Sequence, residues 1–244
     1  MFSVAPGHVQ AWGKEGHYST CKIAEPLLSE KTVKAVNAIL PKYAQNDLAS
    51  LCSWPDQMRF RYHWANPLHF IDTPDGKCGY DYSRDCHNEN GEKGMCLEGA
   101  INNYTSQLST YGHKSHGNQH NLTEALLFLS HFMGDIHQPL HVGFSSDRGG
   151  NSIELHWYRR KSNLHHVWDV AILETSMKDF YNNDLEVLIQ DVQKNITDLW
   201  STDVSAWQEC NTDDLACPKS YADESIILAC KWAYKDAEQD SVLE

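Results

Sequence analysis

The chain has 244 residues, of which 41% are hydrophobic and 22% are charged, and its formal net charge at pH 7 is -13. This length and composition suit one globular domain with a sizeable core. The acidic balance excludes a protein that wraps nucleic acid with a basic face, and the chain lacks the run of about twenty apolar residues that spans a membrane.

Apolar periodicity predicts an all-α, mainly helical chain with little β-structure. The expected helices are residues 17–28, 29–40, 97–110, 121–136, 164–177, 184–200 and 220–236. One alternating stretch, at residues 152–158, predicts a short strand. Residues 72–96 are rich in Gly, Asp, Asn and Cys and are expected to form a long irregular loop held by disulfides. Tryptophans are usually core residues, so the expected core includes Trp54, Trp64, Trp157, Trp168, Trp200, Trp207 and Trp232.

The first eleven residues, MFSVAPGHVQA, end in Val-Gln-Ala, which satisfies the small-residue rule for signal-peptide cleavage before Trp12. No charged stretch or long apolar stretch precedes this point. We therefore interpret residues 1–11 as the remainder of a truncated signal peptide and residues 12–244 as a single domain. Eight cysteines and the N-glycosylation sequons at Asn103, Asn121 and Asn195 indicate the secretory route, to the cell exterior or a vacuole.

The helix expected at residues 121–136 carries the densest group of candidate metal ligands. Asn121 and Glu124 have the spacing of a capping box at its start. His131 and Asp135 are four residues apart and therefore lie on one face of the helix. Because this helix is apolar on nearly all sides, it is predicted to be buried. A buried carboxylate requires a partner, which a metal ion supplies.

The same spacing recurs at His165 and Asp169. One such pair alone is usually a surface ion pair. Two pairs together with further candidates favour a metal centre, and the number of ligands exceeds what one tetrahedral zinc ion takes. We therefore predict two or three zinc ions. The further candidate ligands are His17, Asp56, His69 and His141. The cysteines lack the paired Cys-x-x-Cys spacing of structural zinc sites, so disulfides are expected, in pairings that the spacing leaves open.

Six segments resemble the zinc-dependent single-strand-specific nucleases, and most closely the plant bifunctional nucleases. The resemblance runs in order from Trp12 to about Tyr234. It implies a single helical domain of the zinc phospholipase C and single-strand nuclease type. The segments are Trp12-Gly-x-x-Gly-His17, Trp54-Pro-Asp56-x-x-Arg59, Pro67-Leu-His69-Phe-x-Asp72, Ser130-His-Phe-x-Gly-Asp-x-His-Gln-Pro-Leu-His141, Gly149-Gly-Asn151 and Asn163-Leu-His-x-x-Trp-Asp169.

The resemblance implies three zinc ions bound by histidine and aspartate side chains. The first ion has the ligands Asp56, His69, His131 and Asp135. The second has His141, His165 and Asp169. The third takes the free amine and carbonyl of Trp12 together with His17, and shares Asp135 as a bridging carboxylate. The implied disulfides are Cys21–Cys52, Cys78–Cys230, Cys86–Cys96 and Cys210–Cys217.

Roles in catalysis and substrate binding are also implied by the resemblance. Asp56 would orient or deprotonate the attacking water, and Arg59 would offset charge that grows on the phosphoryl oxygens. Phe70 would stack on a base while Asp72 accepts hydrogen bonds from its edge, and Asn151 would line the phosphate site. Stacking requires an unpaired base, which explains a preference for single strands.

The expected function is zinc-dependent endonucleolytic hydrolysis of single-stranded DNA and RNA to 5'-phosphate products, with 3'-nucleotidase activity. The protein is expected to be a monomer. Two departures from the family weigh against this. With residues 1–11 attached, the Trp12 nitrogen is an amide and not an amine. Family chains also continue into a further helical stretch, so we expect reduced stability here, with loss of activity as one outcome.

Two alternatives remain open. A zinc phospholipase C shares the fold and most ligands, but that family usually has Glu at the place of Asp169 and lacks this base pocket and this set of cysteines. A secreted zinc-binding glycoprotein that is inactive through truncation would bind zinc stoichiometrically without hydrolysing anything.

Overall fold

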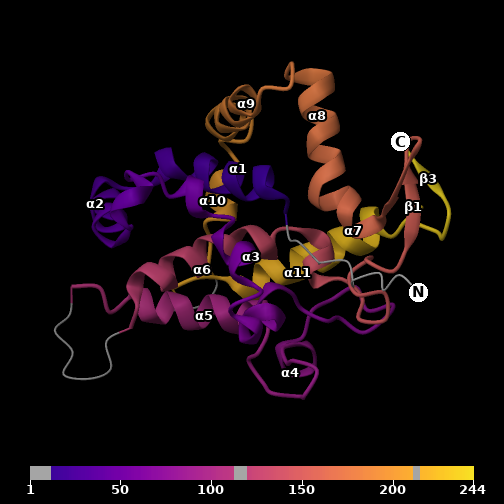
Figure 1. Ribbon diagram of the computed structural model, residues 1–244, viewed down its shortest axis with the longest axis horizontal. Coiled ribbons are helices and arrows are strands. Elements are labelled where there is room, and N and C mark those ends of the chain that lie inside the picture. Colours follow the sequence, from indigo (N-terminus) through magenta and orange to yellow (C-terminus); the bar gives the residue numbers. More distant parts are fainter. Residues whose placement is uncertain (1–11, 113–119, 211–214) are drawn as a thin grey trace.

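The structure of the chain is a computed structural model that describes residues 12–112, 120–210 and 215–244. The predicted signal remnant at residues 1–11 lies outside this part of the chain. Helices dominate and strands are few, which confirms the all-α expectation (Figure 1). None of the described helices is both long and apolar enough to cross a lipid bilayer.

The core is built around α6 (Leu122–Ile136), which packs along α5 (Leu97–Leu108) as Figure 1 shows. Phe128 and Phe132 of α6 are completely buried in the largest apolar cluster. This burial follows from the apolar residues on nearly all sides of α6. The helix therefore holds any polar side chain on its buried face in a rigid, water-poor setting.

The start of α6 matches half of the predicted capping box. The Asn121 side chain caps the helix by accepting a hydrogen bond from the Glu124 backbone N–H, at 3.2 Å. The Glu124 carboxylate instead accepts a hydrogen bond from the Tyr62 hydroxyl, at 3.4 Å. A tertiary contact thus replaces the second bond of the box.

Short helices surround α6 and bring segments from distant parts of the chain to it. Helix α1 also packs along α9. Before α5 the helices are α1 (Lys14–Ala24), η1 (Glu25–Leu27), α2 (Glu30–Ile39), η2 (Lys42–Ala44), η3 (Ala49–Leu51), α3 (Trp54–Met58), η4 (His63–His69) and α4 (Tyr82–Asp85). After α6 they are η5 (Pro139–Val142), α7 (Leu164–His166), η6 (Val167–Ala171), α8 (Ile172–Phe180), α9 (Leu185–Thr197), α10 (Val204–Trp207), α11 (Pro218–Leu228) and η7 (Ala229–Ala233).

Two of the predicted helices contain π-helical turns. The expected helix at 164–177 is α7, the π-helical η6 and α8 in succession. The expected helix at 220–236 begins earlier, as α11, and ends in the π-helical η7. A π-turn inserts one residue into the helical repeat and occurs often at functional sites. The turn η6 includes Asp169, which is one of the predicted ligands.

The expected strand at 152–158 is β1 (Glu154–Trp157). It pairs antiparallel with β2 (Arg160–Asn163) and parallel with β3 (Val242–Leu243), so the order in the small sheet is β2-β1-β3. The sequence predicted neither β2 nor β3. The residues of β2, Arg-Lys-Ser-Asn, show no apolar alternation, and its pairing comes from backbone bonds to β1 across a tight turn.

All eight cysteines form disulfides, in the pairs implied by the family resemblance: Cys21–Cys52, Cys78–Cys230, Cys86–Cys96 and Cys210–Cys217. The loop at 72–96 contains one bridge within itself and is tied by another to η7. The short helix α4 also lies within this loop, which is therefore less irregular than expected.

Three of the seven tryptophans expected in the core are exposed. Trp64, Trp207 and Trp232 are 48%, 53% and 55% exposed. The prediction was wrong for these residues because an indole ring is large enough to pack one part against the protein while another part stays in water.

Candidate metal centre

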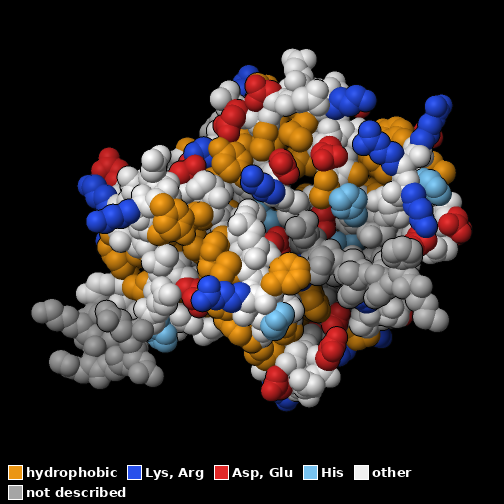
Figure 2. All heavy atoms as spheres, viewed as in Figure 1, with side chains coloured by type: hydrophobic (Ala, Val, Ile, Leu, Met, Phe, Trp, Pro, Cys, Tyr) orange, Lys and Arg blue, Asp and Glu red, His pale blue; other side chains and the backbone are white. Residues whose placement is uncertain are grey.

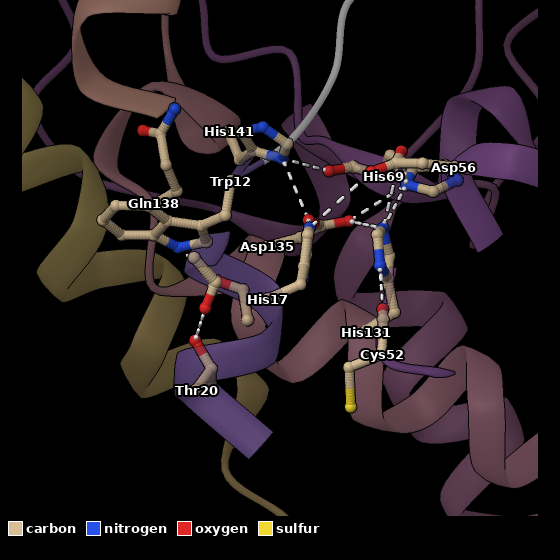
Figure 3. A network of polar contacts seen from close by, with 12 residues as sticks. Trp12, His17, Thr20, Cys52, Asp56, His69, His131, Asp135, Gln138 and His141 are labelled. Atoms are coloured by element: carbon tan, nitrogen blue, oxygen red, sulfur yellow. Dashed lines mark hydrogen bonds and ion pairs between the residues drawn. The ribbon is translucent and has the colours of Figure 1, made fainter. Parts of the chain in front are cut away.

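A group of buried polar side chains meets at the inner face of α6 (Figure 3). We call it the central group; its members come from α1, α3, η4 and α6. Asp135 lies at its middle and is completely buried. The central group consists of His17, Asp56, His69, His131 and Asp135.

The two carboxylate oxygens of Asp135 face different histidines. Oδ2 lies 3.0 Å from His69 Nδ1 and 3.2 Å from His131 Nε2. Oδ1 lies 3.3 Å from His17 Nε2 and 3.8 Å from His141 Nδ1. A carboxylate placed in this way has the geometry of a bridge between two cation positions.

Asp56 closes the other side of the central group. Its Oδ1 lies 3.7 Å from His131 Nε2 and 3.9 Å from His69 Nδ1, and its Oδ2 lies 3.8 Å from His17 Nε2. Arg59 follows one helical turn later, with Nη1 3.7 Å from Asp56 Oδ1. The guanidinium group therefore lies at the edge of the central group, as its predicted role requires.

A second buried group, which we call the outer group, consists of His141, His165 and Asp169. His165 Nε2 lies 3.1 Å from Asp169 Oδ2, and the rings of His141 and His165 are stacked with centroids 5.1 Å apart. The outer group is the ligand set predicted for the second ion.

Gln138 orients Asp169 and is a residue that the sequence analysis missed. It is completely buried, its side-chain amide donates a hydrogen bond to Asp169 Oδ1, and its Oε1 accepts one from the Leu140 backbone. Asp169 Oδ2 is thereby left facing His165. The only signal in the sequence is the position of Gln138 between two histidines, and no spacing rule links an amide in a turn to a carboxylate 31 residues later.

Backbone carbonyls fix the orientation of three histidine rings. The Nδ1 atoms of His131, His141 and His165 lie 2.7, 2.6 and 2.7 Å from the carbonyl oxygens of Cys52, His69 and Gly149 respectively. Because a carbonyl only accepts, each Nδ1 carries the hydrogen and each neutral ring has its lone pair on Nε2. This is the usual arrangement of metal-binding histidines.

The donor set fits cations. Several buried acceptor atoms of the two groups have no hydrogen-bond partner, among them Asp56 Oδ1, Asp135 Oδ1, His141 Nε2 and His165 Nε2. Carboxylate oxygens and imidazole lone pairs that face one another without an intervening hydrogen repel, and a metal ion removes this cost. Three triads have candidate ligand atoms within 4.8 Å of one another: His17–Asp56–His131, His69–His131–Asp135 and His141–His165–Asp169.

Burial and neighbouring charges shift the pKa values of these histidines in opposite directions. Burial lowers the pKa of His17 and His141 and lowers that of His69 to about 4. For His131 and His165 burial acts in the same sense, but the carboxylates of Asp135 and Asp169 outweigh it and raise the pKa. His17, His69 and His141 are therefore neutral at pH 7, which is the form that binds a metal.

Metal-stripped protein is expected to lose stability as the pH falls from 6.5 to about 4, the ordinary and folded pKa values of His69. In this window the unfolded chain binds a proton that the folded chain does not, so the free energy of unfolding decreases as the pH falls. His69 alone contributes on the order of 3 kcal/mol. His131 and His165 do not offset this loss. Their raised pKa values stabilise the folded chain, but this contribution to the free energy of unfolding stays constant below the pKa that the histidines have in the unfolded chain.

Thermal melts in the presence of chelator at about pH 6.5, 5.5 and 4.5 measure this dependence. A His69→Gln variant should show a weaker dependence, since it removes one titrating group. A melting temperature that is constant or rises toward low pH would contradict the prediction.

The remaining predicted residues lie around the two groups. Phe70 and Asp72 follow His69 and are half-buried, and the Ile71 backbone between them donates to the His141 carbonyl at 2.7 Å. Burial, and then the charge of Glu89, raises the pKa of the Asp72 carboxyl.

Asn151 and Trp12 each bind a backbone carbonyl next to a predicted ligand or its neighbouring loop. Asn151 donates from its side chain to the Arg148 carbonyl at 2.7 Å, in the loop that also presents the Gly149 carbonyl to His165. The Trp12 indole donates to the carbonyl of Gly134, the residue before Asp135, at 3.0 Å. Figure 3 shows Trp12 beside the central group. The structure thus brings all nine predicted ligand residues into one region.

Comparison with known proteins identifies the family of this chain. The sequence model of the family described as S1/P1 Nuclease matches residues 12–244. The chain belongs to the S1/P1 nuclease family. Endonuclease 1 of Arabidopsis thaliana is 56% identical over 238 residues, which are 96% of this chain and 78% of that protein.

Two further relatives show the range of similarity within the family. Endonuclease 2 of Arabidopsis thaliana is 55% identical over 241 residues, covering 98% of this chain and 82% of the relative. Nuclease P1 of Penicillium citrinum is 34% identical over 190 residues, covering 76% of this chain and 67% of the relative. The similarity therefore includes plant and fungal proteins named as nucleases.

Proposed function

We propose that this protein is a zinc-dependent endonuclease that hydrolyses phosphodiester bonds of single-stranded DNA and RNA to 5'-phosphate products and also acts as a 3'-nucleotidase. The observation that carries the proposal is Asp135, a completely buried carboxylate whose two oxygens face four histidine rings. Membership of the S1/P1 nuclease family supports the nuclease class. Zinc is the proposed metal because imidazole and carboxylate ligands suit it.

The proposed ligands follow the two groups. The outer group would hold one ion, and the central group would hold two, with Asp135 as a ligand of both. One of the central ions would also need the amine and carbonyl of Trp12, and the amine is available only on a chain that begins at that residue. Zinc bound there would supply Lewis-acid chemistry for the phosphoryl oxygen and would lower the pKa of a water toward neutral pH.

The chain's own residues position the substrate and move the proton. Asp56 orients the attacking water and accepts its proton, since its carboxylate lies at the edge of the central group. Arg59, 3.7 Å from Asp56, offsets charge that develops on the phosphoryl oxygens. Asn151 lines the phosphate site from the loop beside His165.

Preference for single strands is proposed to come from Phe70 and Asp72. The ring of Phe70 stacks on a base, and the carboxylate of Asp72 accepts hydrogen bonds from the base edge. Phe70 and Asp72 lie one and three residues after the proposed ligand His69, so a base held there would be close to the central group. A paired base in a duplex presents neither a free face nor a free edge.

Export of the protein as a glycoprotein, to the cell exterior or a vacuole, is also proposed. The four disulfides form in oxidising compartments. The side chains of the sequon residues Asn103 and Asn121 are exposed, and that of Asn195 is partly exposed, so a glycan can attach at each.

Release of acid-soluble nucleotides from single-stranded DNA and RNA at mildly acidic pH tests the proposed function. The protein is processed to begin at Trp12 and assayed as purified, after chelation, and after zinc is restored. We expect hydrolysis that chelation abolishes and zinc restores, slower cleavage of duplex DNA, and phosphate release from a 3'-nucleotide. A folded, zinc-loaded protein that hydrolyses none of these would identify a non-catalytic zinc protein instead.

A further inference from the structure

The segment between Asp56 and His69 starts and ends at the central group. Asp56 Oδ1 and His69 Nδ1 are 3.9 Å apart although twelve residues separate them in the sequence. The intervening chain, residues 57–68, therefore leaves the metal centre and returns to it, and its exposed side chains flank the site on the outside.

This segment differs in charge from the rest of the chain. The protein has 33 acidic residues and a net charge of -13, yet no Asp or Glu occurs between Asp56 and Asp72. The same stretch contains Arg59, Arg61 and His63. The charged side chains of the segment itself are thus basic, although the Glu124 carboxylate from α6 accepts a hydrogen bond from its Tyr62. These cations attract a polyanion to an otherwise acidic protein.

Two large aromatic side chains of the segment are exposed, Phe60 by 68% and Trp64 by 48%. Trp64 is nevertheless held in place, because its ring packs against Tyr62 and Phe128 with centroid distances of 5.7 Å in both cases. Tyr62 in turn contacts Trp54 at 5.9 Å. Figure 2 shows apolar side chains beside basic and histidine side chains on this face, over the region where Figure 1 places α3.

We propose that Phe60, Arg61 and Trp64 form a binding track for the unpaired strand that extends from the metal centre. Bases stack on the two rings, and Arg61 pairs with a backbone phosphate between them. The proposal rests on the proposed function and extends it from the nucleotide at the central group to the neighbouring ones. Aromatic rings interleaved with cations are the usual means of binding single strands without sequence preference.

The fixed position of Trp64 favours this partner over an apolar one. A ring already packed on Tyr62 and Phe128 loses little rotational freedom when a base stacks on its free part. The basic side chains beside it would be desolvated by an apolar partner but are neutralised by phosphate. A strand on the track also runs continuously into the site, because the segment begins at Asp56.

Hydrolysis of two substrates by Trp64→Ala and Phe60→Ala variants of the zinc-loaded protein tests the track. With a single strand of about twenty nucleotides, kcat/KM is expected to fall about tenfold in each variant, mainly through KM. With a dinucleotide, which is too short to reach the track, kcat/KM should not change. Trp64→Phe, which keeps a ring, should restore most of the activity on the long strand.

A charge variant and a matched control sharpen the test. Arg61→Ala should reduce the slope of log KM against log salt for the long strand by about 0.7, the effect of one phosphate contact on a single strand. Phe180→Ala removes a ring that is 78% exposed at the end of α8. It should leave kcat/KM unchanged on both substrates.

The outcomes separate the track from the proposed function. If Phe60→Ala has the wild-type kcat/KM on the long strand, and Trp64→Ala lowers kcat/KM equally on both substrates or on neither, the track is wrong. If wild-type protein hydrolyses neither substrate, the proposed function itself is wrong. Phe60→Ala keeps the test valid should Trp64→Ala fail to fold, since Phe60 is largely exposed.

Discussion

Under the proposed function, replacing Asp135 with asparagine is expected to abolish zinc-dependent hydrolysis and metal binding at the central group. Asparagine has the same shape but lacks the negative charge, and only one of its two terminal atoms can bind a cation. Asp135 is the side chain that faces both His17 and the pair His69 and His131, at 3.0 to 3.3 Å. Its loss therefore affects two ion positions at once.

The expected loss in metal affinity at the central group exceeds the ~10–100-fold that follows removal of an outer hydrogen-bond partner of a ligand. The measurements are metal content per molecule after dialysis, kcat/KM on single-stranded DNA, and the rise in melting temperature on adding zinc. The outer group should keep any ion it holds. His165 and Asp169 do not contact Asp135, and the His141 ring, 3.8 Å from it, is held by the bond from its Nδ1 to the His69 carbonyl at 2.6 Å.

Glu124→Gln is the matched control for Asp135→Asn. It makes the same chemical change on the same helix, but the Glu124 carboxylate contacts the Tyr62 hydroxyl and lies away from both groups. Metal content, and kcat/KM on a dinucleotide that does not reach the track, should be unchanged in this variant. Retention of the full metal content by Asp135→Asn would show that the carboxylate does not bridge two ions.

The ligand pairs within one helix were predictable from spacing alone. His131 and Asp135, and His165 and Asp169, are four residues apart, and the structure places each pair within 3.2 Å. Helical periodicity fixes such neighbours without reference to the rest of the fold. The burial of α6, which excludes a simple surface ion pair, was also visible in its apolar sequence.

The assembly of the central group could not be derived from spacing. His17, Asp56 and His69 come from α1, α3 and η4, and only the resemblance to a known family indicated that they meet. The carbonyls of Cys52 and Gly149 that orient the rings left no trace in the sequence, because every residue has a carbonyl. The π-turn at Asp169 and the exposure of Trp64 likewise depend on tertiary packing.

Removal of the Cys21–Cys52 disulfide is expected to weaken metal binding as well as stability. Cys21 lies one helical turn after His17 in α1, and Cys52 lies four residues before Asp56. The Cys52 carbonyl accepts the hydrogen bond from His131 Nδ1 at 2.7 Å, and Cys52 is completely buried. The bridge thus joins the two segments that carry His17 and Asp56 and also fixes the acceptor that orients His131.

The Cys21→Ser/Cys52→Ser variant should lose about 3–4 kcal/mol of stability, the chain-entropy value for a loop of this length. Zinc affinity at the central group should fall ~10–100-fold, as when the hydrogen-bond partner of a metal ligand is removed. Denaturant unfolding and competition with a zinc chelator measure the two effects. The Cys52 carbonyl is still present in the variant. Any loss of zinc affinity is therefore caused by the greater mobility of residue 52 and not by the absence of the hydrogen-bond acceptor.

The Cys210→Ser/Cys217→Ser variant separates positioning from general destabilisation. This bridge closes a shorter loop, with a sequence separation of 7 against 31, and its Cys210 is exposed. It should lower the free energy of unfolding without changing zinc affinity, because the segments that carry His17 and Asp56 stay joined by Cys21–Cys52. Equal zinc affinities in the two variants would mean that packing against α6 alone holds His17, Asp56 and the Cys52 carbonyl in place.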